Sequence, residues 1–164
     1  MRFWLELNQE KDYGQIPVLN QNGKAEFFIQ GNLDNPNHTL YLNNFRKQEV
    51  GRLFSDGAGL IASFTIDVVN HSLVGVKKLN TPTANIFYLT QLKYIVTGSI
   101  KRGTYTFRSG IKSVASVQTI MGDRGGVLIC DITKPEDVPF ILLTSVLFTP
   151  VSYTHLTLPT ICSV

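Results

Sequence analysis

Apolar and polar residues alternate along most of the chain, a pattern that predicts short β-strands. The alternation covers residues 3–8 at the start and returns at 25–30, directly after an Asn-Gly turn signal within residues 20–23. Asn-Gly supplies the positive φ angles that a tight strand reversal requires. Such segments recur at intervals of about ten residues between polar turns, so we expect roughly a dozen sequential strands.

An internal repeat indicates that these strands pair as hairpins. Residues 64–66 (Phe-Thr-Ile) and 72–76 (Ser-Leu-Val-Gly-Val) recur, without a gap, 41 positions later as 105–107 (Tyr-Thr-Phe) and 113–117 (Ser-Val-Ala-Ser-Val). A hairpin of this size cannot bury its own apolar face, so the copies must pack side by side or close on one another. Closure would also remove exposed strand edges.

The run 138–148 departs from the alternation, because it is apolar on every side, and it predicts a buried central helix. Residues 133–136 fit the S/T-x-x-E capping box, and Asp137 adds a second carboxylate at the positive end of the helix dipole. The hydroxyls of Thr144 and Ser145 can bond back to carbonyls four residues earlier. The expected core residues of the helix are Phe140, Ile141, Leu143, Leu147 and Phe148.

Two alternatives exist for this run. A membrane span requires roughly 20 apolar residues, whereas these eleven, rising about 1.5 Å each, would cover only about half of the hydrocarbon layer. A buried strand is the closer rival, since Val, Ile and Phe suit strands. The Leu-Leu pair and the acidic start favour the helix.

Composition narrows the class of protein. With 164 residues, 43% of them hydrophobic, the chain is long enough for one domain with a substantial core. The net charge of +3 gives a mild attraction to anionic surfaces, well short of the basic field of a nucleic-acid binder, and nucleic acid is not an expected partner. Cys130 and Cys162 form neither a zinc pattern nor a disulfide framework, and residues 1–6 are not a secretory signal, so a cytoplasmic location is expected.

No catalytic or metal-binding set is evident. The adjacent acids at 136–137 are explained by helix capping, and His38 and His71 stand in polar turns. Cys130 lies on a strand leading to the helix, where a thiol acts as a small hydrophobe whose pKa is not lowered. The glycine-rich segment 122–126 lacks the Gly-Lys-Ser/Thr of a phosphate-binding loop, and no H-E-x-x-H or cysteine cluster appears. We expect no enzyme activity, no metal and no cofactor.

Basic residues at hairpin ends are weak candidates for lipid binding. They are Lys77 and Lys78 after one repeat strand and Lys101 and Arg102 before the second copy. Cations gathered at one end of a barrel attract anionic headgroups with about 1 kcal/mol each near a membrane surface. A solvated hairpin end is the alternative.

These motifs together resemble a known family. The Phe-Thr-Ile and Ser-Val-Ala-Ser-Val strands, the opening hairpin at 16–31, the acidic pair and the apolar terminal helix are similar to the LURP-one-related group of the tubby-like superfamily, here as a bacterial member, over residues 3–148. The resemblance implies a mainly β fold, a closed antiparallel barrel of about twelve strands around one central hydrophobic C-terminal helix. Phospholipid scramblases are relatives, and the similar tubby proteins bind phosphoinositides, but none of their headgroup-binding positions can be aligned here.

The segment 151–164 stands apart from this domain. It resembles translated adapter or vector sequence and contains no Lys, Arg, Asp or Glu. We therefore expect a single tubby-like domain over 1–150 and a non-native tail over 151–164. An ordinary tail is the alternative.

The expected function is that of a non-enzymatic binding module for anionic membrane phospholipid or a protein partner, in the cytoplasm or at the membrane periphery, without a membrane span. One alternative is a carrier or enzyme that holds an apolar ligand inside the barrel, which would need an open lumen of a few hundred Å³. The other is a purely structural scaffold, and the sequence does not set the oligomeric state.

Overall fold

The computed structural model describes residues 1–7, 15–31, 40–55, 63–79, 86–99, 102–122 and 125–148. His38, Lys101, Cys162 and the segment 151–164 therefore lie outside the described residues. The strands are β1 (Arg2–Leu7), β2 (Gln15–Leu19), β3 (Ala25–Gly31), β4 (Leu40–Asn44), β5 (Glu49–Ser55), β6 (Ser63–Val68), β7 (Val74–Leu79), β8 (Ile86–Leu89), β9 (Tyr94–Ser99), β10 (Thr104–Ser109), β11 (Lys112–Gly122) and β12 (Gly125–Ile132), followed by the 3-10 helix η1 (Pro135–Asp137) and the helix α1 (Val138–Leu147).

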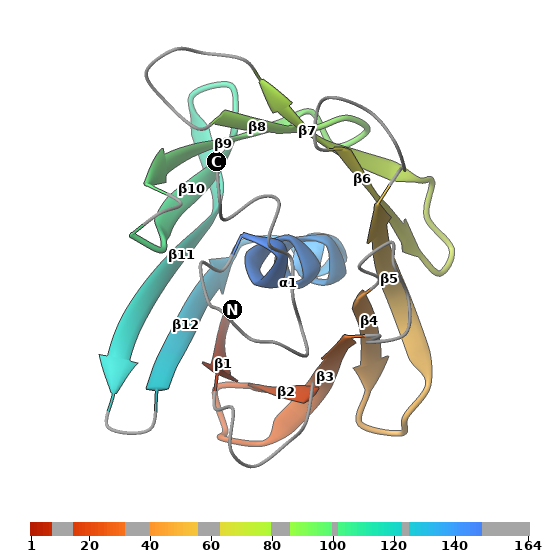
Figure 1. Cartoon of the computed structure of the whole chain (residues 1–164), viewed down its shortest axis with the longest axis vertical. Coiled ribbons are helices and arrows are strands. Elements are labelled where there is room, and N and C mark those ends of the chain that lie inside the picture. Colours follow the sequence, from red (N-terminus) through yellow and green to blue (C-terminus); the bar gives the residue numbers. More distant parts are fainter. Residues whose placement is uncertain are drawn as a thin grey trace.

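The strands form a closed antiparallel barrel. Each strand pairs with its neighbours in sequence, and β1 pairs with β12 to close the ring. Figure 1 shows α1 inside this ring, crossing the space that the strands enclose. The prediction of a mainly β barrel of about twelve strands around one C-terminal helix is confirmed.

The repeated segments form hairpins with the same register. In the β6–β7 hairpin Phe64 lies opposite Val76, and in the β10–β11 hairpin Tyr105 lies opposite Val117. Tyr105 and Val117 each stand 41 positions after their counterparts Phe64 and Val76, so the sequence repeat is also a repeat of strand pairing. The second copy contains a register shift after Phe107.

The helix α1 fills the centre of the barrel. Its predicted core residues are almost completely buried: Phe140, Ile141, Leu143, Leu147 and, directly after the helix, Phe148. The hydroxyls of Thr144 and Ser145 each donate to the carbonyl four residues earlier, both at 2.6 Å, as predicted. These bonds satisfy the two polar side chains of the helix without water.

The predicted capping box is wrong. Neither η1 nor α1 begins with a side-chain capping hydrogen bond, although Glu136 and Asp137 occupy the acidic first turn of η1. The residue at the cap position of η1 is Lys134, whose side chain has no acceptor, and the residue at the cap position of α1 is Asp137. The carboxylate of Asp137 instead accepts a hydrogen bond from the hydroxyl of Tyr94 at 2.7 Å.

The two ends of the barrel differ in their connections. At the end where β2, β4, β6, β8 and β10 finish, which we call the short-turn end, the connections are 20–24, 45–48, 69–73, 90–93 and 110–111. β12 also finishes there, so the chain enters α1 from this side. At the opposite end the connections are 8–14, 32–39, 56–62, 80–85, 100–103 and 123–124.

Candidate functional site

The two predicted lysines of β7 point to opposite faces of the sheet. Lys77 is exposed and lies opposite Tyr88, whereas Lys78 is half-buried and lies opposite the buried Phe87. Consecutive residues of a strand alternate between its two faces, so only Lys77 belongs to the outer wall. Adjacency in sequence therefore does not bring these cations into one cluster.

Arg102 occupies the connection between β9 and β10 and is exposed. Its backbone N–H donates to the hydroxyl of Ser99 at 3.2 Å. Because β7 and β9 both finish at the opposite end of the barrel, Lys77 and Arg102 share that end, with β8 between their strands. The structure thus places these two candidates at one end of the barrel but on separate strands.

Cys130 is enclosed by the core, as the sequence predicts. Its Sγ lies 3.6 Å from the hydroxyl of Ser145, whose carbonyl accepts a hydrogen bond from the hydroxyl of Tyr105 at 3.3 Å. Burial raises the pKa of Cys130 to about 12, so its thiol is protonated at neutral pH. A protonated thiol in the core has neither the charge nor the access of a nucleophile.

A buried acid at the start of α1 was not identified as a core group from the sequence. Asp137 is 2% exposed, and burial raises its pKa above the usual value, opposed by the hydrogen bond from Tyr94 and by the charge of Lys134. The pKa of Tyr94 is also raised, first by burial and then by Asp137. The two residues are 43 positions apart, so no local pattern could have paired them.

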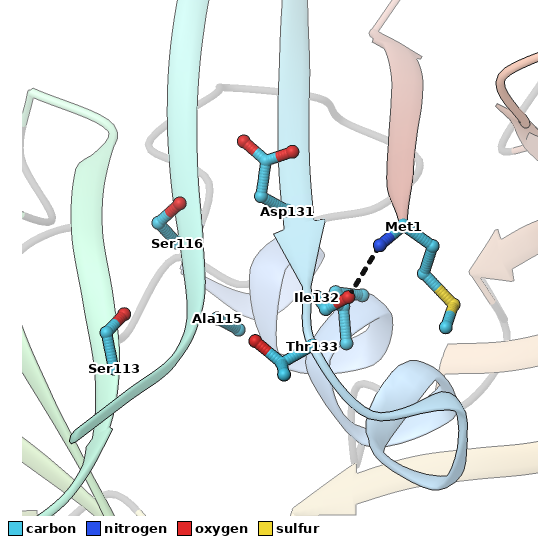
Figure 2. A pocket seen from close by; sticks show the side chains of 7 residues that line it. All are labelled: Met1, Ser113, Ala115, Ser116, Asp131, Ile132 and Thr133. Atoms are coloured by element: carbon cyan, nitrogen blue, oxygen red, sulfur yellow. Dashed lines mark hydrogen bonds between the residues drawn. The ribbon is translucent and has the colours of Figure 1, made fainter.

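A small groove lies where β11 begins and β12 ends. Figure 2 shows the hydroxyls of Ser113, Ser116 and Thr133 and the carboxylate of Asp131 around a space of about 220 Å³. This volume is below the roughly 300 Å³ at which ligand pockets usually begin. The groove offers hydrogen bonds to water or a small polar group.

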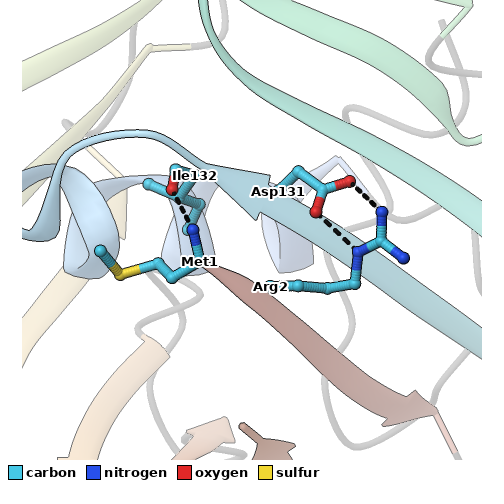
Figure 3. A network of polar contacts seen from close by, with 4 residues as sticks. All are labelled: Met1, Arg2, Asp131 and Ile132. Atoms are coloured by element: carbon cyan, nitrogen blue, oxygen red, sulfur yellow. Dashed lines mark hydrogen bonds and ion pairs between the residues drawn. The ribbon is translucent and has the colours of Figure 1, made fainter. Parts of the chain in front are cut away.

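The carboxylate in this groove is already engaged. Arg2 donates from Nε and Nη2 to the two oxygens of Asp131, at 2.7 and 3.1 Å (Figure 3). The amine of Met1 donates to the carbonyl of Ile132 at 2.8 Å in the same view. Both contacts extend the pairing of β1 with β12, so this corner of the groove serves barrel closure.

The described ranges contain neither a metal-binding cluster nor a membrane-crossing helix. No group of three or more His, Cys, Asp or Glu side chains there is arranged to hold a metal ion. Neither helix of these ranges has the length and apolar character needed to cross a membrane.

Comparison with known proteins identifies the fold. No family model matches the sequence, and no curated protein matches it. Among solved structures, the chain is similar to a crystal structure of a protein from Arabidopsis thaliana, with a TM-score of 0.55 and 14% sequence identity over 88% of this chain and 89% of that chain. At this identity the likeness shows a shared fold across nearly the whole domain, a closed barrel around a central helix.

Proposed function

We propose that the protein is a non-enzymatic binding module that engages anionic membrane phospholipid through the outside of its barrel. The observation that carries this proposal is the filled interior. Ile141, Leu142 and Leu143 are fully buried inside the ring, in the space that a carrier would reserve for an apolar ligand. The outer wall and the two ends are therefore the surfaces at which the protein can act.

We further propose that the chain is a tubby-like, LURP-one-related domain over residues 1–150 of a cytoplasmic protein, with 151–164 as a non-native tail. The closed barrel, the central helix and the two hairpins of identical register support this assignment. Lys77, Lys78, Lys101 and Arg102 remain candidate lipid contacts. Because Lys77 and Lys78 point to opposite faces of the sheet, these four residues do not form one cluster, and the cations of the short-turn end are considered beside them.

Sedimentation with liposomes tests the proposed function. We expect the full chain to pellet with vesicles that contain phosphatidylserine and to stay in the supernatant with vesicles of phosphatidylcholine alone, because cations gain about 1 kcal/mol each near an anionic surface. Equal binding to both kinds of vesicle, or binding to neither, would refute it. Light scattering on the same samples separates vesicle binding from self-association.

A further inference from the structure

We infer that the short-turn end is the surface that docks on the membrane, and that apolar side chains at the tips of its turns enter the bilayer interface. This inference rests on the proposed function and names the contact surface. Large apolar side chains are exposed at few places in the described residues, and most of them gather at this end. At the short-turn end they are Met1, Phe45, Val69, Leu73 and Ile111, whereas Ile95 lies on the wall of β9, and Ile120 and Met121 lie toward the far end of β11.

The most prominent tips are Ile111 and Phe45, which are 99% and 62% exposed. Gly110 supplies the positive φ angle of the two-residue turn between β10 and β11. The geometry of the turn therefore does not require an apolar residue at Ile111. The side chain of Ile111 has no packing role within the described residues and is therefore available to a surface outside the chain.

The turn that carries Phe45 is closed by hydrogen bonds to the side chain of Asn44. The side-chain oxygen of Asn44 accepts hydrogen bonds from the backbone N–H groups of Arg46 and Gln48, at 2.9 and 3.0 Å. The guanidinium of Arg46 lies 5.4 Å from the centre of the Phe45 ring. An apolar ring and a cation are thus presented together, the combination that suits the boundary between acyl chains and anionic headgroups.

Cations surround these tips. The short-turn connections and their immediate flanks carry Lys24, Arg46, Lys47, Lys93, Lys112 and Lys134. Across the same connections and η1, all within the described residues, the acids are Glu136, which is exposed, and Asp137, which is buried. Two acids of the adjoining strands are held in ion pairs, Asp131 by Arg2 and Glu49 by Arg52. This end therefore presents an excess of positive charge to a flat anionic surface.

Fewer cations are described at the opposite end. They are Lys77 and Lys78 near the end of β7 and Arg102 in the connection between β9 and β10. Within the described residues, this difference favours the short-turn end as the one that approaches an anionic bilayer.

The distribution of the tips favours a membrane over a protein partner. Phe45, Val69 and Leu73 stand on two turns that are neighbours around the rim, and Ile111 stands on a turn separated from them by the β8–β9 connection with Lys93. The core of a protein interface is a contiguous apolar patch depleted of charge. Separate tips with cations between them can instead enter a planar bilayer one by one.

The first test removes the tips and leaves the charge unchanged. We expect the double variant Phe45→Ser/Ile111→Ser to bind phosphatidylserine vesicles about tenfold more weakly than the wild type, the loss that corresponds to roughly 1.4 kcal/mol. The matched control is Ile120→Ser/Met121→Ser, which removes two exposed apolar side chains of β11. The control should bind like the wild type. All four positions are solvent-exposed, so thermal melting should show that each variant folds.

The second test compares the two ends at equal net charge. Arg46→Glu/Lys47→Glu and Lys77→Glu/Arg102→Glu each replace two cations by two carboxylates, so a difference between them reports location. We expect the first pair to weaken vesicle binding by at least tenfold more than the second. In addition, the emission of Ile111→Trp should shift to the blue on anionic vesicles, and that of Ile120→Trp should not.

The outcomes separate this inference from the proposed function. If the wild type fails to bind anionic vesicles, both are wrong. If the wild type binds but the tip variant equals its control, or if the Lys77/Arg102 pair has the larger effect, the docking surface lies elsewhere and the proposed function stands. Loss of binding in the tip variant alone supports both.

Discussion

Asp137 gives the stability of this protein a pH dependence opposite to that of most acids. Its carboxylate is buried at the start of α1 with the hydroxyl of Tyr94 as hydrogen-bond donor. Because burial raises its pKa, the folded state binds a proton more readily than the unfolded state. The contribution of this group to the free energy of unfolding therefore increases as the pH falls through the folded pKa, and it decreases as the pH rises.

The variant Asp137→Asn tests this contribution. The amide oxygen can still accept from Tyr94, but the side chain no longer carries a charge in the core. We expect the variant to gain most over the wild type near neutral pH, and the gain to shrink toward about pH 4, where the unfolded-state carboxylate also takes up a proton. Urea unfolding at several pH values measures the difference. A gain that grows with falling pH would show that the fold stabilises the ionised form.

The same region shows which residue-level features local patterns can predict. The bonds of Thr144 and Ser145 to carbonyls four residues earlier follow from helix geometry alone, and both were predicted correctly. The capping box was wrong because Lys134, which has no acceptor in its side chain, occupies the cap position of η1, so Thr133 lies one residue too early to act as the cap. Asp137 instead accepts a hydrogen bond from a tyrosine of a distant strand. Residue spacing along the chain predicts contacts within a turn of helix, but it cannot predict partners from another strand.

At the scale of elements, α1 depends on the barrel and the barrel depends on α1. The helix is apolar around its whole circumference, so it is soluble only when the ring encloses it. In return, the helix and the residue that follows it supply the inward-facing residues of the strands with partners, such as Phe148 against Phe87 at 4.4 Å between ring centres.

The variant Leu143→Asp is therefore expected to unfold the domain. An unpaired charge at a fully buried position costs several kcal/mol, which is comparable to the whole stability of a domain. Circular dichroism should show the loss of the cooperative thermal transition. The control Met121→Asp, at a position that is 77% exposed, should change the free energy of unfolding by no more than about 0.5 kcal/mol. A Leu143→Asp protein that melts like the wild type would contradict the central position of the helix.

The strands and the helix were predictable because each has its own pattern of apolar and polar residues within a short stretch of sequence. The repeat at 64–76 and 105–117 also predicted the pairing of two hairpins, since equal spacing implies an equal register. The docking surface was not predicted, because it depends on which turns share an end of the barrel. Ile111, an apolar residue between Gly110 and Lys112 in a turn, was the sequence signal that could have indicated it.

For the whole molecule, the proposed docking combines two forces with different responses to salt. The attraction of the cations weakens as the Debye length falls from about 10 Å at 0.1 M to about 3 Å at 1 M salt, whereas the insertion of apolar tips does not. We expect the wild type to retain part of its vesicle binding at 1 M salt and the Phe45→Ser/Ile111→Ser variant to lose it. Complete release of the wild type by salt would indicate docking by charge alone.

The closure of the barrel by β1 and β12 has a consequence for the order of events in folding. Arg2 and its partner Asp131 are 129 positions apart, and α1 follows both in the chain. A ribosome therefore makes the helix that fills the interior only after the twelve strands that enclose it. Pairing between such distant segments folds slowly, and the unpaired edges of β1 and β11 are open to other chains in the meantime. The interval between the synthesis of β11 and of α1 is thus when this chain is most exposed to aggregation.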